Sequence, residues 1–534
     1  MELKLSPQAV WLWFTGTGGA LVNYESFFTR YEHIYVCKNT VNPESTKTQM
    51  FQDYLPSQTA LTLLIGAIII FAVQRSKSSP LRSLPLPPGP PVTSWLSGHS
   101  SIIPATQPWK VYTKWAEKYG PVIHLRVYGE HTLILSSLDD CTEIFEKRSN
   151  LYSDRPTFTM LNLMGWDFNA AVMPYGPRWR RSRRLFQQAF KKVTSPTFRP
   201  EQTRKVNDML YSLLTSPDDF RDHTKFMAAA TSMSITYGYD IKANNDHFVN
   251  LAESAAAGFS SAILPGAALV NALPILRYLP SWFPGAGFHQ SAAESREMLK
   301  QMKEAPLQWV QKNMEAGTQS NCLVSERMPA CKTDGDFINL RDFAAIVYVA
   351  AADTTTSALQ TFFYAMTIYP DAQKKAQQEL DAVVGKTRLP NYDDWDSLSY
   401  IEALLREVLR WRPVLPLGAP HAITEDDVFK GYLIPKGSVI IPNAWAISRD
   451  ESRYQDPEAF NPDRFFDKDG NLNEDDSDYL FGFGRRVCPG RHLARGSLWL
   501  SMATTLWAFN IAKARDASGN EIPVNVEYTD GLMM

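Results

Sequence analysis

Helical periodicity of apolar side chains dominates the chain from about residue 93 onward. In most segments apolar positions recur every three or four residues, which is typical of helices with one buried face. Two short runs, Val122–Tyr128 and Leu133–Ser136, instead have the composition of strands and predict a neighbouring pair. We therefore expect a mainly α fold with small β-sheets over residues 93–534.

One apolar run stands before this region. Ala60–Val73 carries no charge and, extended toward Leu55, approaches the ~20 residues that span a bilayer. The basic residues Arg75 and Lys77 follow it, which by the positive-inside rule places the downstream chain in the cytosol. We expect a transmembrane anchor over residues 55–76, with a buried core helix as the alternative.

A second apolar run, Phe343–Met366, is interrupted by Asp353-Thr-Thr-Thr-Ser357. A membrane span would place Asp353 near its centre at a cost of roughly 2.5–3.5 kcal/mol. The pattern therefore predicts a core helix with a polar break. Threonine hydroxyls in such a break bond back to preceding carbonyls and can open the helix locally.

The N-terminal segments are less regular. Residues 1–54 form an extension of unknown role, because their apolar stretch is broken by glycines. A signal-like segment, a membrane-dipping helix and a packed surface element are all compatible with it. Residues 77–92 combine basic side chains with Leu84-Pro-Leu-Pro-Pro-Gly-Pro-Pro91, which predicts a stiff connector or hinge.

Composition narrows the class of protein. A hydrophobic content of 44% with 21% charged residues is typical of an ordered globular chain. The net charge of −2 gives no support for a nucleic-acid partner. Five scattered cysteines fit neither a disulfide framework nor a Cys-x-x-Cys zinc site, so a reducing compartment is expected for the main body.

One cysteine lies in a distinctive loop, Phe481-Gly-Phe-Gly-Arg-Arg-Val-Cys-Pro-Gly490. Gly484 and Gly490 permit turns and close backbone approaches that a Cβ would block. The proline after Cys488 suits the first turn of a helix, whose N-terminus would favour a thiolate, and Arg486 adds a positive charge nearby. Such a thiolate could be a nucleophile, a redox thiol or a metal ligand.

The spacing of this loop resembles the haem-binding loop of the cytochrome P-450 family, the haem-thiolate monooxygenases. The resemblance implies the P-450 fold, in which haem b lies between two long helices. It makes Cys488 the axial ligand of the haem iron, with Phe481, Gly484, Arg486 and Gly490 forming the rest of the loop that binds the cofactor. The alternative is a buried structural cysteine beside a turn.

The polar break in the apolar helix also resembles this family. Ala350 to Thr355 matches its Ala-Gly-x-Asp-Thr-Thr pattern, except that Ala351 stands where glycine is usual. The resemblance implies that Thr354 holds dioxygen and a water molecule and that Asp353 helps to relay protons. A methyl group at Ala351 narrows the groove beside them. The alternative is a helix whose hydroxyls only cap its own carbonyls.

Further positions match the residues that hold the haem propionates in the family. Trp179 and Arg183 share one face of a basic helix because they lie four residues apart. Their indole and guanidinium groups can donate to a carboxylate. Arg486 and His421 match two more propionate positions. For the basic helix, the alternative is a solvated surface.

Glu407 and Arg410 share a helix face, although Glu201 and Arg204 have the same spacing. The sequence around the first pair resembles a family helix, and Arg464 lies in a matching downstream segment. The resemblance implies that Glu407, Arg410 and Arg464 form a buried charge network that supports the haem loop.

The resemblance covers about residues 84–534 and is closest in character to fungal microsomal members. It implies a membrane-bound monooxygenase of secondary metabolism at the endoplasmic reticulum, with a single-pass anchor and a cytosolic catalytic domain over residues 93–534. This enzyme would insert one oxygen atom of O2 into a lipophilic small molecule. Because the chain has no flavin or nicotinamide motif, NADPH-cytochrome P-450 reductase would supply the electrons, with cytochrome b5 as a second donor.

Two other functions are compatible with the same sequence. One is a haem-thiolate isomerase, dehydratase or peroxygenase that needs no reductase, which the pair Asp353 and Thr354 argues against. The other is a non-catalytic membrane protein that binds haem or a ligand.

Overall fold

The computed structural model describes residues 80–242, 245–263 and 269–524, together with Gly66, Tyr528 and Met533. The expected extension over residues 1–54 lies outside the described residues. So does the expected anchor over residues 55–76, apart from Gly66, and the beginning of the proline-rich segment. Residues 80–534 belong to one unit, which is described below.

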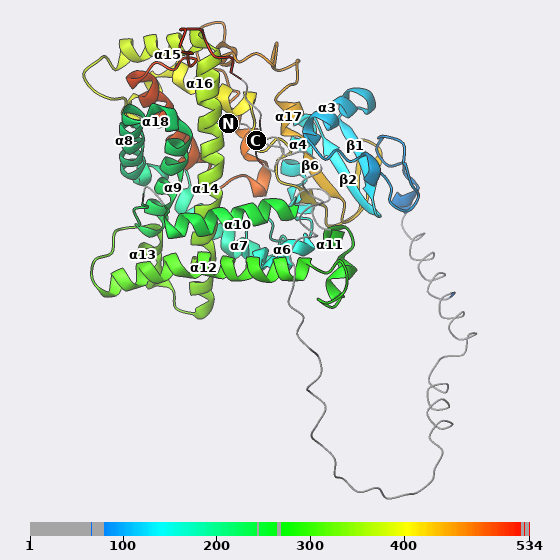
Figure 1. Cartoon of the computed structure of the whole chain (residues 1–534). Helices are drawn as coiled ribbons and strands as arrows, with labels where there is room; N and C mark the ends of the chain where they lie inside the picture. The colour runs from blue at the N-terminus through cyan, green and yellow to red at the C-terminus, as the bar shows by residue number, and fades with distance from the viewer. Residues whose placement is uncertain are drawn as a thin grey trace, which may run out of the picture. The chain divides into compact units, whose positions relative to one another are not determined.

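Helices make up most of this unit, as the sequence predicts, and α14 runs through its helical part (Figure 1). The helices before α14 are α3 (Pro108–Tyr119), α4 (Leu138–Thr142), α5 (Ser149–Tyr152), α6 (Thr159–Met164), α7 (Pro177–Phe190), α8 (Arg199–Thr215), α9 (Phe220–Tyr237), α10 (His247–Ile263), α11 (Leu269–Ala272), α12 (Phe288–Glu315) and α13 (Leu323–Arg327). Those that follow are α14 (Asp334–Ile368), α15 (Pro370–Val383), α16 (Ser399–Trp411), α17 (Ala444–Ile447) and α18 (Arg491–Ala508).

The ends of α14 follow from its sequence. Thr333 and Asp336 form a capping box, in which each side chain accepts a hydrogen bond from the other residue's backbone N–H. The helix ends at Ile368, because Pro370 disfavours helical backbone at the residue before it and starts α15. The polar break does not interrupt α14, which is continuous over all 35 residues, and the expected back-bonds of threonine hydroxyls are present at Thr354 and Thr356.

Helix α14 contributes side chains to two separate apolar cores. Phe343–Tyr348 packs with side chains from α6, α7, α9 and α12, whereas Ala358–Met366 packs with side chains from α8, α15, α16 and α18. In Figure 1, α10 and α12 cross α14, and both contact it. The polar residues in the middle of α14 therefore lie between the two cores. Among the described helices, none combines the length and apolar character needed to cross a bilayer.

A four-stranded sheet lies to one side of the helices (Figure 1). The predicted pair is confirmed, because β1 and β2 are antiparallel with Val122 opposite Leu135. β6 then pairs parallel to β2, and β3 pairs antiparallel to β6, with His421 opposite Ile440. The described strands are β1 (Val122–Val127), β2 (Glu130–Leu135), β3 (His421–Ala422), β6 (Val439–Pro442) and, in a separate hairpin, β4 (Asp427–Phe429) and β5 (Tyr432–Ile434).

The proline-rich run is attached to both sheets. The carbonyl of Pro88 accepts a hydrogen bond of 2.9 Å from His124 N in β1, and the carbonyl of Pro85 accepts one of 2.9 Å from Leu433 N in β5. A Cβ on Gly89 would lie only 2.2 Å from the His124 carbonyl oxygen, so glycine is required for this close approach. The described part of the run is therefore fixed to the body.

Candidate functional site

The loop before α18 holds Cys488 by backbone contacts. The N–H of Cys488 donates to the carbonyl of Phe481 over 2.8 Å. Gly484 has a φ of +52°, and a Cβ there would lie 2.2 Å from the carbonyl oxygen of Phe145, so both conformation and space require glycine. Gly490 has an ordinary φ of −85°, and a Cβ would meet Cys488 Sγ at a normal 3.9 Å. The described residues therefore do not explain a need for glycine at 490.

The thiol of Cys488 differs from the sequence-based expectation. Helix α18 begins at Arg491, not at Pro489. Burial raises the pKa of Cys488, and the N–H groups of Gly490 and Arg491 together with the charges of Arg183 and Arg491 only partly offset this effect. The N–H groups at the helix start therefore lower the pKa of Cys488, as the sequence predicts, but burial by the surrounding fold has the larger effect and raises it. A metal cation bound to the sulfur would supply the missing stabilisation of the thiolate.

Three guanidinium groups gather near this loop without a carboxylate partner. Among the described residues, Arg155, Arg183 and Arg486 form no ion pair, although Asp154 lies close enough to affect two of them. Burial lowers the pKa of Arg155 to about 9 and that of Arg486 to about 10, and repulsion from Arg486 contributes to the shift of Arg155. Buried charges are normally paired, so this cluster indicates a missing anion.

The hydrogen bonds of these arginines show where an anion would bind. Arg155 donates to the carbonyls of Ala171 (2.8 Å), Ala419 (2.8 Å) and Pro420 (2.5 Å), which leaves its Nη2 without a bond to any described residue. The Nε of Arg183 is buried and has no partner in the described chain. Both groups can therefore donate to an added carboxylate.

Arg486 has a different environment from the one expected. It donates to the carbonyls of Ser153 (2.8 Å), Ala170 (3.0 Å) and Met173 (2.9 Å). These bonds connect the loop that contains Cys488 to the chain before α7. Its guanidinium also lies 4.3 Å from the ring centre of the buried Trp179. The charge of Arg486 is not among those that change the pKa of Cys488. The charges that lower this pKa are those of Arg183 and Arg491.

His421 can bind a carboxylate in only one protonation state. Its Nδ1 lies 2.7 Å from the carbonyl oxygen of Tyr152, which can only accept, so Nδ1 must carry a proton. Burial lowers the pKa of His421 well below its usual range, with further lowering by Arg155 and Arg486. The neutral ring then offers Nε2 only as an acceptor. His421 would therefore donate to a propionate only as an imidazolium.

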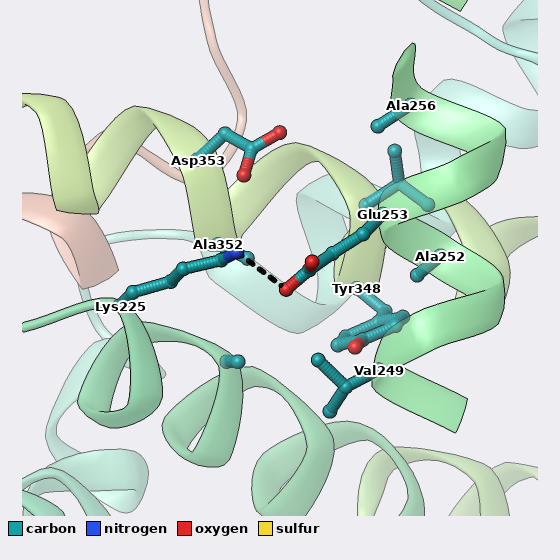
Figure 2. Close-up of a pocket in the computed structure, with 10 residues that line it drawn as sticks. Lys225, Val249, Ala252, Glu253, Ala256, Tyr348, Ala352 and Asp353 are labelled. Atoms are coloured by element: carbon teal, nitrogen blue, oxygen red, sulfur yellow. Dashed lines mark ion pairs between the residues drawn. The ribbon is translucent and has the colours of Figure 1, made fainter. Parts of the chain in front are cut away.

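The middle of α14 presents accessible side chains between the two apolar cores. Ala350 is exposed and residues 351–354 are partly exposed, in contrast to the buried run Phe343–Tyr348. The hydroxyl of Thr354 donates to the carbonyl of Ala350 over 2.8 Å. Asp353 lies about 100° around the helix from Thr354 and lines a pocket with Lys225 and Glu253 (Figure 2). Burial raises the pKa of Asp353, while Lys225 lowers it and Glu253 raises it.

These observations fit haem b, the cofactor that the resemblance implies. Cys488 offers a sulfur ligand, and Arg155 and Arg183 have free donors for two carboxylates such as the haem propionates. Leu493, in the first turn of α18, packs in the same apolar cluster as Phe343 of α14. Since α14 and α18 also contact each other, the helix that follows the cysteine loop borders the same apolar cluster as α14.

The predicted charge network is assembled behind this region. The carboxylate of Glu407 is bound at both oxygens by Arg410, at 2.6 and 2.7 Å, and Arg464 Nε lies 3.2 Å from it. Arg410 also donates to the carbonyls of Ser448 and Pro457. Both side chains of the Glu407–Arg410 pair are 0% exposed. The similarly spaced pair Glu201–Arg204 is instead on the surface. The resemblance to the family helix around Glu407 therefore identified the buried pair correctly.

Arg155 was missed by the sequence reasoning. It stands in a loop between α5 and α6, where neither helical spacing nor a motif used above singles it out. The following Pro156 predicts only extended backbone at this position. Its role depends on carbonyls more than 200 residues away, at Ala419 and Pro420.

We expect Arg155→Leu to weaken haem retention by roughly 10- to 100-fold. The estimate corresponds to losing charged hydrogen bonds of about 1.5–3 kcal/mol. The matched control is Arg178→Leu, which removes an exposed guanidinium paired with Asp167. Haem transfer to apomyoglobin measures retention in variants shown to be folded by circular dichroism. Equal retention in both variants would contradict the assignment of Arg155.

Comparisons with known proteins agree with this geometry. The sequence model described as Cytochrome P-450 matches residues 87–525. Cytochrome P-450 monooxygenase 208 of Postia placenta is 40% identical over 90% of this chain and 93% of its own length. Cytochrome P-450 monooxygenase ple1 of Rhodocybe pseudopiperita is 39% identical, with coverage of 84% and 87%. Tryptamine 4-monooxygenase of Psilocybe cyanescens is 36% identical, with coverage of 88% and 95%.

A match of this extent to the family, together with these relatives, settles the class of the protein. Members of the family carry haem b with a cysteine thiolate ligand, and the residues described above fit that cofactor. The chain belongs to the cytochrome P-450 family and is a monooxygenase.

Proposed function

We propose that this monooxygenase inserts one oxygen atom of O2 into a lipophilic small molecule, with electrons from a separate NADPH-dependent reductase. The observation that carries the proposal is the region between Cys488 and the middle of α14. It combines a sulfur ligand, buried cations without counter-ions and an accessible Asp353–Thr354 pair within apolar cores. Apolar walls with a few placed polar groups favour a lipophilic substrate.

The residues of the chain have separate tasks in this proposal. When bound, the haem supplies a redox-active iron that activates O2. Cys488 donates its sulfur to that iron, and Arg155 and Arg183 hold the acidic groups of the cofactor. The hydroxyl of Thr354 donates a hydrogen bond to the carbonyl oxygen of Ala350, so only its oxygen lone pairs are free for another partner. It can therefore accept a hydrogen bond from water or substrate and so direct that donor's position.

Asp353 supplies protons to the same region. Its raised pKa brings the carboxyl closer to neutral pH than an ordinary aspartate, which favours a group that must both bind and release a proton. The methyl of Ala351, on the turn between Ala350 and Thr354, restricts the space in which a water could lie.

Surface features support the proposed partners. The exposed side chains of Ile275, Tyr278 and Trp282 form an apolar segment suited to a membrane surface. We place the enzyme at the endoplasmic reticulum, with the anchor expected at 55–76 and the catalytic domain in the cytosol. The exposed Arg180 and Arg181 of α7 suit an acidic partner such as NADPH-cytochrome P-450 reductase, with cytochrome b5 as a second donor.

Reconstitution with this reductase tests the proposed function. We expect product formation to require NADPH, reductase and O2, and each product molecule to carry one atom of label from 18O2. One relative is named for tryptamine, so aromatic amines join terpenoids, sterols and fatty acids in the substrate panel. Equal turnover without reductase would instead identify an isomerase, a dehydratase or, with peroxide, a peroxygenase.

We expect Thr354→Ala to keep the haem but to lower the product formed per NADPH by about tenfold or more, with the lost electrons appearing as peroxide. Placed proton-transfer groups contribute roughly 10²–10⁴-fold, and Thr354 is one member of such a set. The control is Thr356→Ala, since Thr356 makes the same 2.8 Å bond to the carbonyl four residues before it but lies ~200° around the helix. Unchanged coupling in Thr354→Ala would remove this hydroxyl from the reaction.

A further inference from the structure

Two tryptophan rings are stacked beside α18, the helix that follows the cysteine loop (Figure 1). The rings of Trp395 and Trp499 have centres 4.6 Å apart and planes that differ by only 4°. Aromatic pairs in proteins usually have centres about 4.5–7 Å apart, so this pair is at the close end of the range. The ring of Tyr392 lies 6.1 Å from Trp395 and 6.2 Å from Trp499. These three residues are called the aromatic cluster below.

The aromatic cluster extends from the surface into the interior. Trp499 on α18 is 0% exposed, whereas Trp395, in the helical turn Tyr392–Ser397, is partly exposed. Helix α18 begins at Arg491, shortly after Cys488. At about 1.5 Å of rise per residue, Trp499 lies roughly 12 Å along α18 from that N-terminus. The stacked pair therefore forms a continuous contact of two π-systems between solvent and the helix that follows the cysteine loop.

The surroundings favour loss of an electron from the indoles without loss of a proton. Trp499 Nε1 is buried and has no hydrogen-bond partner among the described residues, so its proton has no acceptor there. The hydroxyl of Tyr392 donates a hydrogen bond to the carbonyl oxygen of Gly496 over 3.1 Å, and burial raises the pKa of this phenol. Oxidation of tyrosine requires that the phenol proton leave, and a carbonyl does not take it. The indoles are therefore easier to oxidise than Tyr392.

Charges around the aromatic cluster also favour the indoles. The guanidinium of Arg199 lies 4.7 Å from the centre of the Tyr392 ring, so a second positive charge on this ring is disfavoured. Trp395 instead has two exposed aspartates, Asp393 and Asp396, beside it in the chain. Two stacked rings share a positive charge, which lowers the energy of the oxidised pair below that of one isolated ring. An electron vacancy in the aromatic cluster is therefore expected on the indoles.

We propose that the stacked pair of Trp395 and Trp499 removes oxidising equivalents from the haem centre when no substrate consumes them. Trp499 gives one electron to the oxidised haem centre, which is reduced by one electron, and the positive charge is shared with Trp395. Both indoles keep their N–H protons, and no bond forms or breaks. Ascorbate or a thiol in solution then returns one electron to Trp395, is oxidised by one electron and releases its proton to solvent. The pair acts only when oxygen insertion fails, so this role lies outside the proposed function.

The test treats the haem-loaded enzyme with hydrogen peroxide in the absence of substrate. Each peroxide takes up two electrons and two protons and becomes two waters, so neither the proposed reductase nor O2 is needed. Electron paramagnetic resonance of freeze-quenched samples detects a tryptophan radical. Mass spectrometry of peptides locates the oxidised indoles that accumulate without a reductant. Loss of the Soret band measures damage to the haem.

We expect the wild-type enzyme to form a tryptophan radical that ascorbate removes. Trp499→Phe should lose this radical, because Trp395 is then separated from the interior by a ring that is hard to oxidise. Trp395→Phe should lower the yield of the radical and abolish its reduction by ascorbate, because the remaining indole is buried. In both variants the haem should be lost several-fold faster than in the wild type when ascorbate is present.

The matched control is Trp507→Phe, on the same helix. Trp507 Nε1 donates to the carbonyl of Gly385 over 2.7 Å, and among the described rings none is stacked on the indole of Trp507. This variant should leave the radical, its reduction and the lifetime of the haem unchanged. Before peroxide is added, circular dichroism and the carbon monoxide difference spectrum identify the variants that are folded and carry thiolate-bound haem.

Three results would overturn the proposal. The first is an unchanged radical in both variants, or oxidised products located on other residues such as Tyr175 or Trp179. The second is a Trp395→Phe radical that ascorbate still removes as in the wild type, and this variant decides alone if Trp499→Phe does not fold. The third is an equal acceleration of haem loss in Trp507→Phe, which would indicate a general effect of replacing tryptophans.

Discussion

Replacement of Cys488 by alanine should abolish turnover and remove the red-shifted Soret band that marks a thiolate-bound haem. The sulfur of Cys488 lies among the N–H groups of Gly490 and Arg491 and beside Arg183, and this arrangement favours the anion once a metal cation is present. Alanine leaves the same loop with no atom that can bind iron. The measurement is the difference spectrum of the dithionite-reduced protein with carbon monoxide.

The control for this prediction is Cys331→Ala. Cys331 is also a partly buried free cysteine, but it follows α13 and belongs to a different part of the fold. This variant should retain the band and the turnover. A Cys488→Ala protein that keeps the band would show that another residue binds the haem iron.

The second large effect is expected for Arg410→Ala, which should lower the free energy of unfolding by about 3–5 kcal/mol. Glu407 would then remain as a buried carboxylate bound only by Arg464 and the backbone N–H of Asn461. The carbonyls of Ser448 and Pro457 would each lose a donor. The side chains of Glu407 and Arg410 are inaccessible to solvent, so water cannot replace the lost bonds. Denaturant unfolding, followed together with haem loss, measures the change.

Arg204→Ala is the matched control, because Glu201 and Arg204 have the same sequence spacing, and Arg204 also pairs with Asp240, but all three side chains are accessible to solvent. Surface ion pairs contribute little, so we expect a change within about 0.5–1 kcal/mol. Equal losses of unfolding free energy in the two variants would mean that burial does not increase the contribution of the network around Glu407.

The sequence predicts best the features that depend on short spacing. The strand pair at Val122, the basic helix that begins near Trp179 and the network of Glu407 all follow from periodicity or from family motifs. A residue such as Arg155 could not be found this way, because two of its three partners, Ala419 and Pro420, precede β3 and are distant in sequence.

Electrostatic properties were the least predictable part of the site. The acidity of Cys488 was expected from the helix N-terminus and the charge of Arg486, but burial by the surrounding fold raises the pKa of the thiol. The charged neighbours of Asp353 could not be predicted for a similar reason. Lys225 and Glu253 stand on two other helices, and only the packing of α9 and α10 against α14 brings them to one pocket.

The attachment of the proline-rich run also bears on how a shorter form of this enzyme could be produced. His99 donates from Nε2 to the carbonyl of Pro90 over 2.9 Å, in addition to the bonds that Pro85 and Pro88 accept. A protein that starts at Pro80 keeps these contacts. One that starts at Val92 would leave the N–H groups of His124 and Leu433 without partners and uncover the edges of two sheets. Because uncovered strand edges promote association between chains, the soluble yield of the enzyme depends on retaining the prolines.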